Sequence, residues 1–260
     1  MEEKKKPIGF YDSGVGGISV LRQTIKLLPG EDYIYFGDSA NAPYGMKDEE
    51  EIRRFSLACG DFLHQKNVKA IVIACNTATS IVVKTMRENY NIPVISMEPA
   101  VKPAKEAHRA GDILVLATPA TLKQARYHAL LARLSIRDRV VDVECAGLAE
   151  LVENGDLSNP QIKACIYEKL RAHAGRKNVC ALVIGCTHYS FISDQINEVA
   201  KKLLRGSCEI YDGMYGTARR TAGVLSENDL LNPTNRRGTV RFFSSLQTDT
   251  ESKFRHFLEL

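Results

Sequence analysis

Short apolar runs alternate with amphipathic stretches along most of this 260-residue chain. The apolar runs, which have the length and composition of buried strands, occupy residues 8–11, 33–36, 70–74, 94–96, 113–117, 140–143, 181–184 and 209–211. Amphipathic stretches of helical period lie between them, at residues 18–28, 49–65, 79–89, 99–109, 121–134, 160–174 and 189–204. Because this alternation is typical of parallel strands joined by crossover helices, the sequence predicts an α/β fold with mainly parallel sheets flanked by helices.

Two segments of the chain repeat one pattern. Residues 69–82, KAIVIACNTATSIV, and residues 180–193, CALVIGCTHYSFIS, each read as a buried strand, a small residue, a cysteine and the start of a helix. Two lobes of similar structure would produce this repeated pattern. Since ligands of open parallel sheets bind beyond the carboxyl ends of the strands, we expect Cys75 and Cys186 to face one cleft.

Charge and composition exclude several classes of protein. The 35 Lys and Arg residues nearly match 31 Asp and Glu residues, for a net charge of +4, so we expect no nucleic-acid partner. Seven cysteines without a CxxC pair fit a reducing compartment. No stretch approaches the ~20 apolar residues of a membrane span, and the N-terminus lacks a signal-peptide core. We therefore expect a soluble, cytoplasmic protein with no membrane partner.

A glycine-rich loop, DSGVGG at residues 12–17, follows the first predicted strand. Backbone N–H groups at the start of a helix attract anions, so this loop could hold a phosphate or a carboxylate. The GxGxxG fingerprint fails at Ser19, and no lysine follows as in a GxxxxGKS/T loop. A substrate carboxylate is thus at least as good a ligand as phosphate, and a tight turn without a ligand is the alternative. A second polar loop, residues 36–45, carries Tyr44, which is either a cleft residue or a surface aromatic.

Cys75 and Cys186 each follow a strongly apolar strand at the expected start of a helix. The helix macrodipole and free N–H groups favour a thiolate there, so we predict a thiol pKa below its usual value of about 8.5 for both. His188 follows Cys186 closely and could tune that thiol. The alternatives are two inert buried cysteines or a zinc site, but the spacing lacks the paired ligands of structural zinc. We expect no metal.

Two acid–base groups on opposite faces of one carbon are what an amino-acid racemase requires. Inversion removes the α-proton from one face and returns a proton to the other. One of two facing cysteines would begin as a thiolate and the other as a thiol, with the roles exchanged for the opposite enantiomer. Hydrogen-bond donors to the substrate carboxylate in a water-poor cleft would stabilise the carbanion-like transition state.

The motifs DSGVGG, GDSANAPYG, ACNTAT and GCTHYS closely resemble, in order and spacing, those of the glutamate racemases of bacterial cell-wall synthesis. The resemblance spans nearly the whole chain, and its two cysteine motifs together are the most specific part. It implies that the catalytic residues are Cys75, Cys186, Asp12, His188 and Glu153. It also implies a substrate-binding set made of Asp12, Ser13, Tyr44, Gly45, Asn76, Thr77, Thr118, Thr121, Thr187 and His188.

The same resemblance implies two pseudo-symmetric α/β lobes with the active site in the cleft between them. The first lobe would comprise residues 1–97 and 209–260 and carry Asp12, Tyr44 and Cys75. The second would comprise residues 98–208 and carry Glu153, Cys186 and His188. Racemases of this kind use no pyridoxal phosphate or other cofactor and supply free D-glutamate to peptidoglycan synthesis. A homodimer fits the family, although the sequence identifies no interface.

Three other functions are alternatives to this interpretation. A sister racemase acting on aspartate or a hydantoin would share the paired cysteines and differ in the pocket. A non-catalytic module could bind a small carboxylate in the cleft, with both cysteines merely packed. A cysteine hydrolase could use Cys186 and His188 but would leave Cys75 without a role. We prefer the racemase because it assigns a role to both cysteine motifs.

Overall fold

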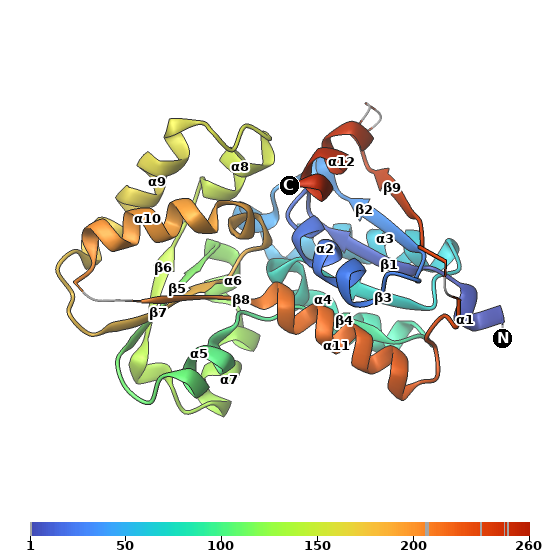
Figure 1. Ribbon diagram of the computed structural model, residues 1–260, viewed down its shortest axis with the longest axis horizontal. Helices are drawn as coiled ribbons and strands as arrows, with labels where there is room; N and C mark the ends of the chain where they lie inside the picture. The colour runs from blue at the N-terminus through green and yellow to red at the C-terminus, as the bar shows by residue number, and fades with distance from the viewer. Residues whose placement is uncertain (1, 206–207, 235, 247, 249) are drawn as a thin grey trace.

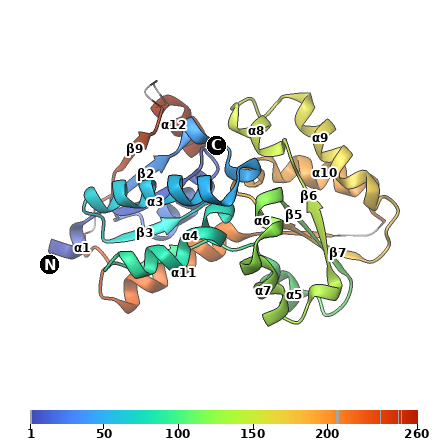
Figure 2. The same ribbon diagram turned by 180° about the vertical axis from the view of Figure 1, so that it is seen from behind.

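Two parallel sheets covered by helices make up the structure, a computed structural model that describes residues 2–205, 208–234, 236–246, 248 and 250–260 (Figures 1 and 2). The first sheet has the strand order β4-β3-β1-β2-β9 and the second the order β6-β5-β7-β8. Every strand pair in both sheets is parallel. The prediction of an α/β fold with two mainly parallel sheets is confirmed.

The strands of the first sheet are β1 (Ile8–Asp12), β2 (Tyr33–Gly37), β3 (Ala70–Ile73), β4 (Val94–Ser96) and β9 (Val240–Ser244). Those of the second sheet are β5 (Asp112–Ala117), β6 (Val140–Glu144), β7 (Val179–Ile184) and β8 (Glu209–Asp212). The central strands β1 and β3 are fully buried because helices cover both faces of the sheet. This explains why they are continuous apolar runs in the sequence.

The α-helices are α1 (Glu2–Lys5), α2 (Ile18–Leu27), α3 (Glu49–Gln65), α4 (Asn76–Asn89), α5 (Val101–Ala107), α6 (Pro119–Lys123), α7 (Ala125–Arg133), α8 (Leu148–Glu153), α9 (Pro160–Leu170), α10 (Ser193–Leu203), α11 (Gly213–Glu227) and α12 (Glu251–Glu259). Short 3-10 turns are η1 (Ser39–Asn41), η2 (Tyr44–Met46), η3 (Arg137–Arg139), η4 (Arg171–His173) and η5 (Thr187–Ile192). Among the described residues, no helix is both long enough and apolar enough to cross a lipid bilayer.

The chain returns to the first sheet after completing the second. Residues 209–212, assigned from the sequence to the first lobe, instead form β8, which pairs with β7 of the second sheet. The return therefore begins with α11, which packs against α2, and continues into β9 beside β2. Residues 206 and 207, near the predicted boundary, lie outside the described residues.

Among the elements that were not predicted from the sequence are β9, α11 and α12, and two predicted helices differ from the structure. The stretch expected at residues 121–134 is two helices that meet at Gln124, whose backbone is extended. The stretch expected at residues 189–204 begins as the 3-10 turn η5 and becomes α-helical only at Ser193. The strand β9 has only one buried residue and lies at the edge of the sheet, so its apolar signal is weak.

A single cluster of buried apolar side chains extends through both sheets. It contains Phe10 and Ile18 from the first half of the chain together with Ile184 and Tyr189 from the second. Two further clusters each cover the outer face of one sheet. The two sheets therefore share part of their hydrophobic core and are not independent globules.

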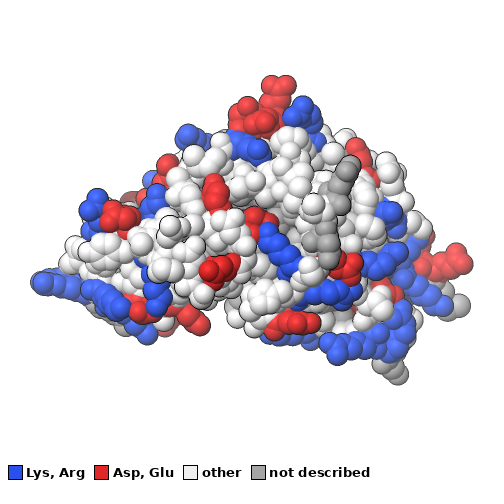
Figure 3. Space-filling model, turned by 90° about the horizontal axis from the view of Figure 1, so that it is seen from above, with Lys and Arg blue, Asp and Glu red and all other residues white. Residues whose placement is uncertain are grey.

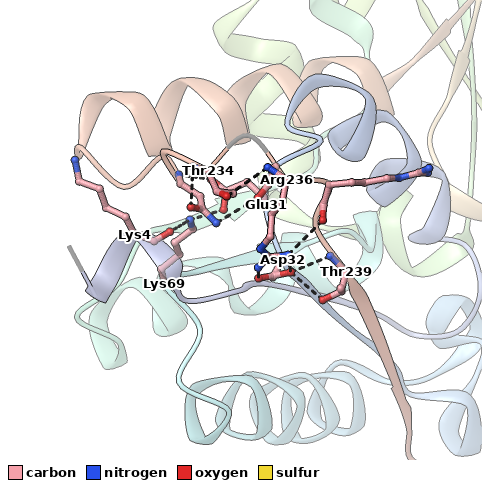
Figure 4. Close-up of polar contacts among 10 residues, drawn as sticks. Lys4, Glu31, Asp32, Lys69, Thr234, Arg236 and Thr239 are labelled. Atoms are coloured by element: carbon pink, nitrogen blue, oxygen red, sulfur yellow. Dashed lines mark hydrogen bonds and ion pairs between the residues drawn. The ribbon is translucent and has the colours of Figure 1, made fainter.

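A buried ion pair secures the end of the first sheet away from the cleft (Figure 4). Lys69, immediately before β3, pairs with Glu31, two residues before β2, and both side chains are almost fully buried. The Lys69 ammonium also donates to the backbone carbonyl of Lys4, 2.6 Å away. Glu31 accepts a hydrogen bond from the backbone N–H of Asn232, 2.8 Å away. This network joins the N-terminal helix to the segment that leads into β9.

Candidate active site

The two cysteines singled out from the sequence lie in one pocket at the carboxyl ends of the strands. Cys75 follows β3 of the first sheet, and Cys186 follows β7 of the second. The space between its lining residues, including the part open to solvent, is about 250 Å³. Of the predicted site residues, the following line it: Ser13, Tyr44, Gly45, Cys75, Asn76, Thr77, Thr118, Cys186, Thr187 and His188. Pro43 and Ala149 also line it and were not predicted, since neither carries a reactive group.

Cys75 caps the N-terminus of α4. Its sulfur accepts a hydrogen bond from the backbone N–H of Ala78 at 3.4 Å and lies 3.9 Å from the Ser13 hydroxyl. Burial raises the pKa of the Cys75 thiol above its usual value, and the nearby Asp12 carboxylate adds to the effect. The prediction that the helix terminus lowers this pKa is wrong, because desolvation outweighs the N–H donor. Cys75 is therefore a protonated thiol at neutral pH.

Cys186 has a different environment. It precedes the 3-10 turn η5, so no α-helix begins directly after it, in contrast to the prediction. Its sulfur lies 3.8 Å from Nδ1 of His188, and Nε2 of the same ring lies 2.8 Å from Oε2 of Glu153. Burial alone would lower the pKa of His188, but contacts with Cys186 and Glu153 raise it well above its usual value. A positively charged imidazole thus lies between a sulfur and a carboxylate.

Glu153, at the end of α8, binds three groups. Its Oε2 accepts hydrogen bonds from His188 and from the backbone N–H of Val15, the latter at 2.9 Å. Its Oε1 lies 2.9 Å from Nζ of Lys253 in α12. Burial alone would raise the pKa of Glu153, yet these partners lower it below its usual value, so the side chain is a carboxylate at neutral pH. Lys253 was missed because a lone lysine in an amphipathic helix resembles any surface lysine.

Asp12, which like Glu153 and Thr121 was predicted for the site but does not line the pocket, joins the two sheets beside it. Its fully buried carboxylate accepts hydrogen bonds from the backbone N–H of Gly14 at 2.9 Å and from the Thr187 hydroxyl at 3.0 Å. Burial raises the pKa of Asp12 above its usual value, although the charge of His188 opposes that effect. Asp12 therefore fixes Thr187, which directly follows Cys186, against the first sheet.

The glycine-rich loop is packed between protein groups. Its N–H groups at Gly14 and Val15 donate to the carboxylates of Asp12 and Glu153, so these two donors are already occupied. A Cβ added at Gly16 would lie 2.4 Å from the Thr187 hydroxyl oxygen and 2.6 Å from Nδ1 of His188. The loop's glycines thus allow the two cysteine-bearing halves to approach each other, and the hypothesis of a phosphate cradle loses support.

Polar side chains gather on the Cys75 side of the pocket. The hydroxyls of Thr77, Thr118 and Thr121 lie within 2.9–3.0 Å of one another. Both polar atoms of the Asn76 amide are buried and have no hydrogen-bond partner among the described residues. Since a buried polar group without a partner is unfavourable, this amide is available to a polar ligand in the pocket.

Tyr44 is buried, so it is not a surface aromatic. Its hydroxyl donates to the carboxylate of Asp38, and its ring stacks on Phe55 with the ring centroids 6.2 Å apart. The adjacent Gly45 lies close to Thr118, since a Cβ there would come within 2.7 Å of the threonine Cγ2. Asp38 was not predicted, although it lies in the same polar loop.

A wider, more open cavity lies elsewhere. It encloses about 1670 Å³ of open space between the crossover after β4 and the start of α11. It does not contain either Cys75 or Cys186, so we place the candidate active site in the smaller pocket. Within the part of the chain that the structure describes, no group of three or more His, Cys, Asp or Glu side chains is arranged to hold a metal ion.

Comparison with known proteins identifies the family of the chain. Residues 16–220 match the family described as Asp/Glu/Hydantoin racemase. A glutamate racemase of Clostridium novyi is 44% identical over 252 residues, covering 96% of this chain and 95% of that protein. A glutamate racemase of Clostridium botulinum is 43% identical over 245 residues, covering 94% of this chain and 93% of that protein.

Solved structures show the same fold. Glutamate racemase of Francisella tularensis in complex with D-glutamate superposes with a TM-score of 0.84 at 30% identity, covering 99% of this chain and 95% of that one. Glutamate racemase of Escherichia coli, in complex with L-glutamate and the activator UDP-MurNAc-Ala, gives a TM-score of 0.79 at 28% identity over 98% and 94% of the two chains. The paired cysteines, the fold and these matches lead to one conclusion: the chain belongs to the Asp/Glu/Hydantoin racemase family.

Proposed function

We propose that this protein is a cofactor-independent glutamate racemase in which Cys75 and Cys186 exchange protons with the α-carbon of the substrate. The observation that carries the proposal is that two cysteines from different sheets line one small, buried pocket. The relatives that are 43–44% identical over most of both chains are named glutamate racemases, which favours glutamate over aspartate as the substrate.

The surroundings of the two cysteines support a different protonation state for each at the start of the reaction. Burial and Asp12 keep Cys75 protonated, as required of the group that returns a proton. The imidazolium of His188 lies beside Cys186, where it stabilises negative charge on the sulfur. In one direction, the Cys186 thiolate takes the α-proton and becomes a thiol, while the Cys75 thiol gives its proton to the opposite face and becomes a thiolate. For the other enantiomer the steps run in reverse.

The remaining pocket residues would hold the substrate. The Asn76 amide and the hydroxyls of Ser13, Thr77 and Thr118 supply polar groups on the Cys75 side, and Thr187 supplies another beside Cys186. Donors to the α-carboxylate stabilise the negative charge that develops as the proton leaves, and a water-poor pocket strengthens them. All seven cysteines of the chain are free thiols, consistent with a cytoplasmic enzyme that supplies D-glutamate to peptidoglycan synthesis.

Solvent exchange tests this function directly. The purified protein, freed of metals and pyridoxal phosphate, is incubated with L-glutamate in deuterated water while optical rotation and the α-proton NMR signal are followed. We expect loss of rotation together with deuterium at the α-carbon, and a fall in racemisation of at least about 1000-fold in Cys75→Ser and in Cys186→Ser. Exchange with aspartate but not glutamate would transfer the proposal to the sister enzyme. Unchanged turnover in both variants would refute the two-thiol mechanism.

A further inference from the structure

The C-terminal helix α12 contacts both halves of the candidate active site. Figures 1 and 2 show it at the side of the first sheet that faces α8. The ring of Phe254 packs against Tyr35, with the centroids 5.4 Å apart, and the Tyr35 hydroxyl donates to the carbonyl of Gly14 at 2.6 Å. The ring of Phe257 packs edge-on against Phe191 of η5, with the centroids 4.8 Å apart. The helix is thus supported from both sheets.

Directly before Phe254, α12 directs Lys253 at Glu153. The ammonium lies 2.9 Å from Oε1 of Glu153, whose side chain is only 12% exposed. Since His188 and Val15 both use Oε2, Lys253 is the partner that the described part of the chain gives to Oε1. A carboxylate held at both oxygens has a fixed rotation, and that rotation sets the orientation of the His188 ring next to Cys186.

We propose that Lys253 is a positioning residue for racemisation, acting through Glu153 and His188 on the Cys186 proton carrier. The inference rests on the proposed function and adds to it a residue on the other side of the cleft from Glu153. No corresponding lysine supports Cys75, whose described partners are Ser13 and the backbone of Ala78. Lys253 therefore supports only one of the two proton carriers.

The charges around Glu153 predict how the pH dependence of activity changes when Lys253 is replaced. The groups that face Glu153 are His188 of η5, Lys253 of α12 and, at longer range, Asp12 at the end of β1 and Tyr35 of β2. The charge of Lys253 is one of the influences that lower the pKa of Glu153, so removing that charge raises this pKa. Protonation of Glu153 removes the acceptor of the His188 N–H. As the pH is lowered, a variant without the Lys253 charge should therefore lose activity at a higher pH than the wild type does.

The test compares three lysine variants in the full chain. Lys253→Met removes the charge while keeping a long side chain, Lys253→Arg keeps the charge, and Lys163→Met removes an exposed lysine that pairs with Glu198 on the surface. We expect kcat/KM to fall about tenfold in Lys253→Met, within the range that coupling between contacting charged groups gives. The acid limb of its pH profile should move to higher pH. Lys253→Arg and Lys163→Met should retain the wild-type profile.

A double variant separates positioning from simple stabilisation of the fold. If Lys253 acts through Glu153, then Lys253→Met should lower kcat/KM no further in a Glu153→Gln background. Equal additional losses in both backgrounds, or a loss that is the same at every pH, would overturn the proposal. Because the two enantiomers have equal free energies, kcat/KM must fall by the same factor in both directions, which checks the assay. Failure of the wild type to racemise glutamate would instead refute the proposed function.

Discussion

At the scale of single residues, Gly16 limits how closely the two cysteine-bearing halves can approach. It lies in the loop between β1 and α2, directly against Thr187 and His188. Any side chain at this position would have to displace the turn that carries Cys186. On the proposed mechanism, Gly16 therefore contributes to the geometry of proton transfer although it has no functional group.

Replacing Gly16 with alanine should impair catalysis more than folding. The new methyl would lie 2.4 Å from the Thr187 hydroxyl, so the Cys186 turn must shift. A misplacement of about 1 Å at a reacting group lowers the rate roughly 100-fold, whereas overpacking lowers the free energy of unfolding by about 1–3 kcal/mol. Racemisation assays and urea unfolding measure the two effects.

The matched control for this variant is Gly216→Ala. Gly216 lies within α11, and a Cβ there meets no atom within 4 Å. This variant should retain wild-type turnover and gain about 0.5–1 kcal/mol in free energy of unfolding, because alanine favours the helix. If Gly16→Ala behaved in the same way, the close approach of the two halves would not govern the rate.

At the scale of elements, the Lys69–Glu31 pair joins segments that lie far apart in the chain. It connects the starts of β2 and β3 with α1 and with the backbone that leads to β9. A charged pair removed from water is unfavourable to separate, since the remaining charge stays buried. The pair thus holds the returning C-terminal segment in place without contacting the active site.

Lys69→Met should lower the free energy of unfolding by about 3–5 kcal/mol, because it leaves the Glu31 carboxylate buried without its cation. Lys84→Met is the control, since that lysine is exposed and pairs with Glu88 at 3.9 Å, where the expected change is about 0.5 kcal/mol or less. Chemical unfolding of both variants gives the comparison. Equal stabilities would mean that the buried pair contributes no more than a surface one.

The elements that the sequence predicted best are the strands buried on both faces. Their apolar runs, such as residues 70–74 and 181–184, have no solvent-facing positions to interrupt them. The edge strand β9 has a single buried residue, and it follows a polar segment. α11 begins with a glycine and contains two more, so its helical signal is weak as well.

The site could be predicted only in part, for a related reason. Cys75 and Cys186 could be predicted because both follow apolar strands of similar sequence. The side chains that surround each cysteine could not, because they are brought together only by tertiary packing. Burial determines the protonation of Cys75, and no local pattern reports it. Likewise, the contact of Lys253 with Glu153 joins residues 100 positions apart in the chain.

At the scale of the whole molecule, the two sheets should unfold as one unit. They share a hydrophobic cluster, and side chains of Asp12 and Glu153 bond across the cleft to Thr187 and Val15. Seen from above, the surface carries Lys and Arg side chains interspersed with Asp and Glu side chains (Figure 3). Calorimetry should show a single transition with equal calorimetric and van't Hoff enthalpies. Two resolved transitions would show that each sheet forms an independent folding unit.

The return of the chain to the first sheet also has a consequence for synthesis. The ribosome delivers the N-terminal part first, so β1 to β4 and the whole second sheet emerge before α11, β9 and α12 exist. A nascent chain can therefore hold both cysteines while Glu153 still lacks Lys253 and β2 still lacks its neighbour β9. On the proposed mechanism, the contacts around Glu153 are completed only when translation has passed α12, so a chain that lacks this helix should racemise more slowly than the full chain.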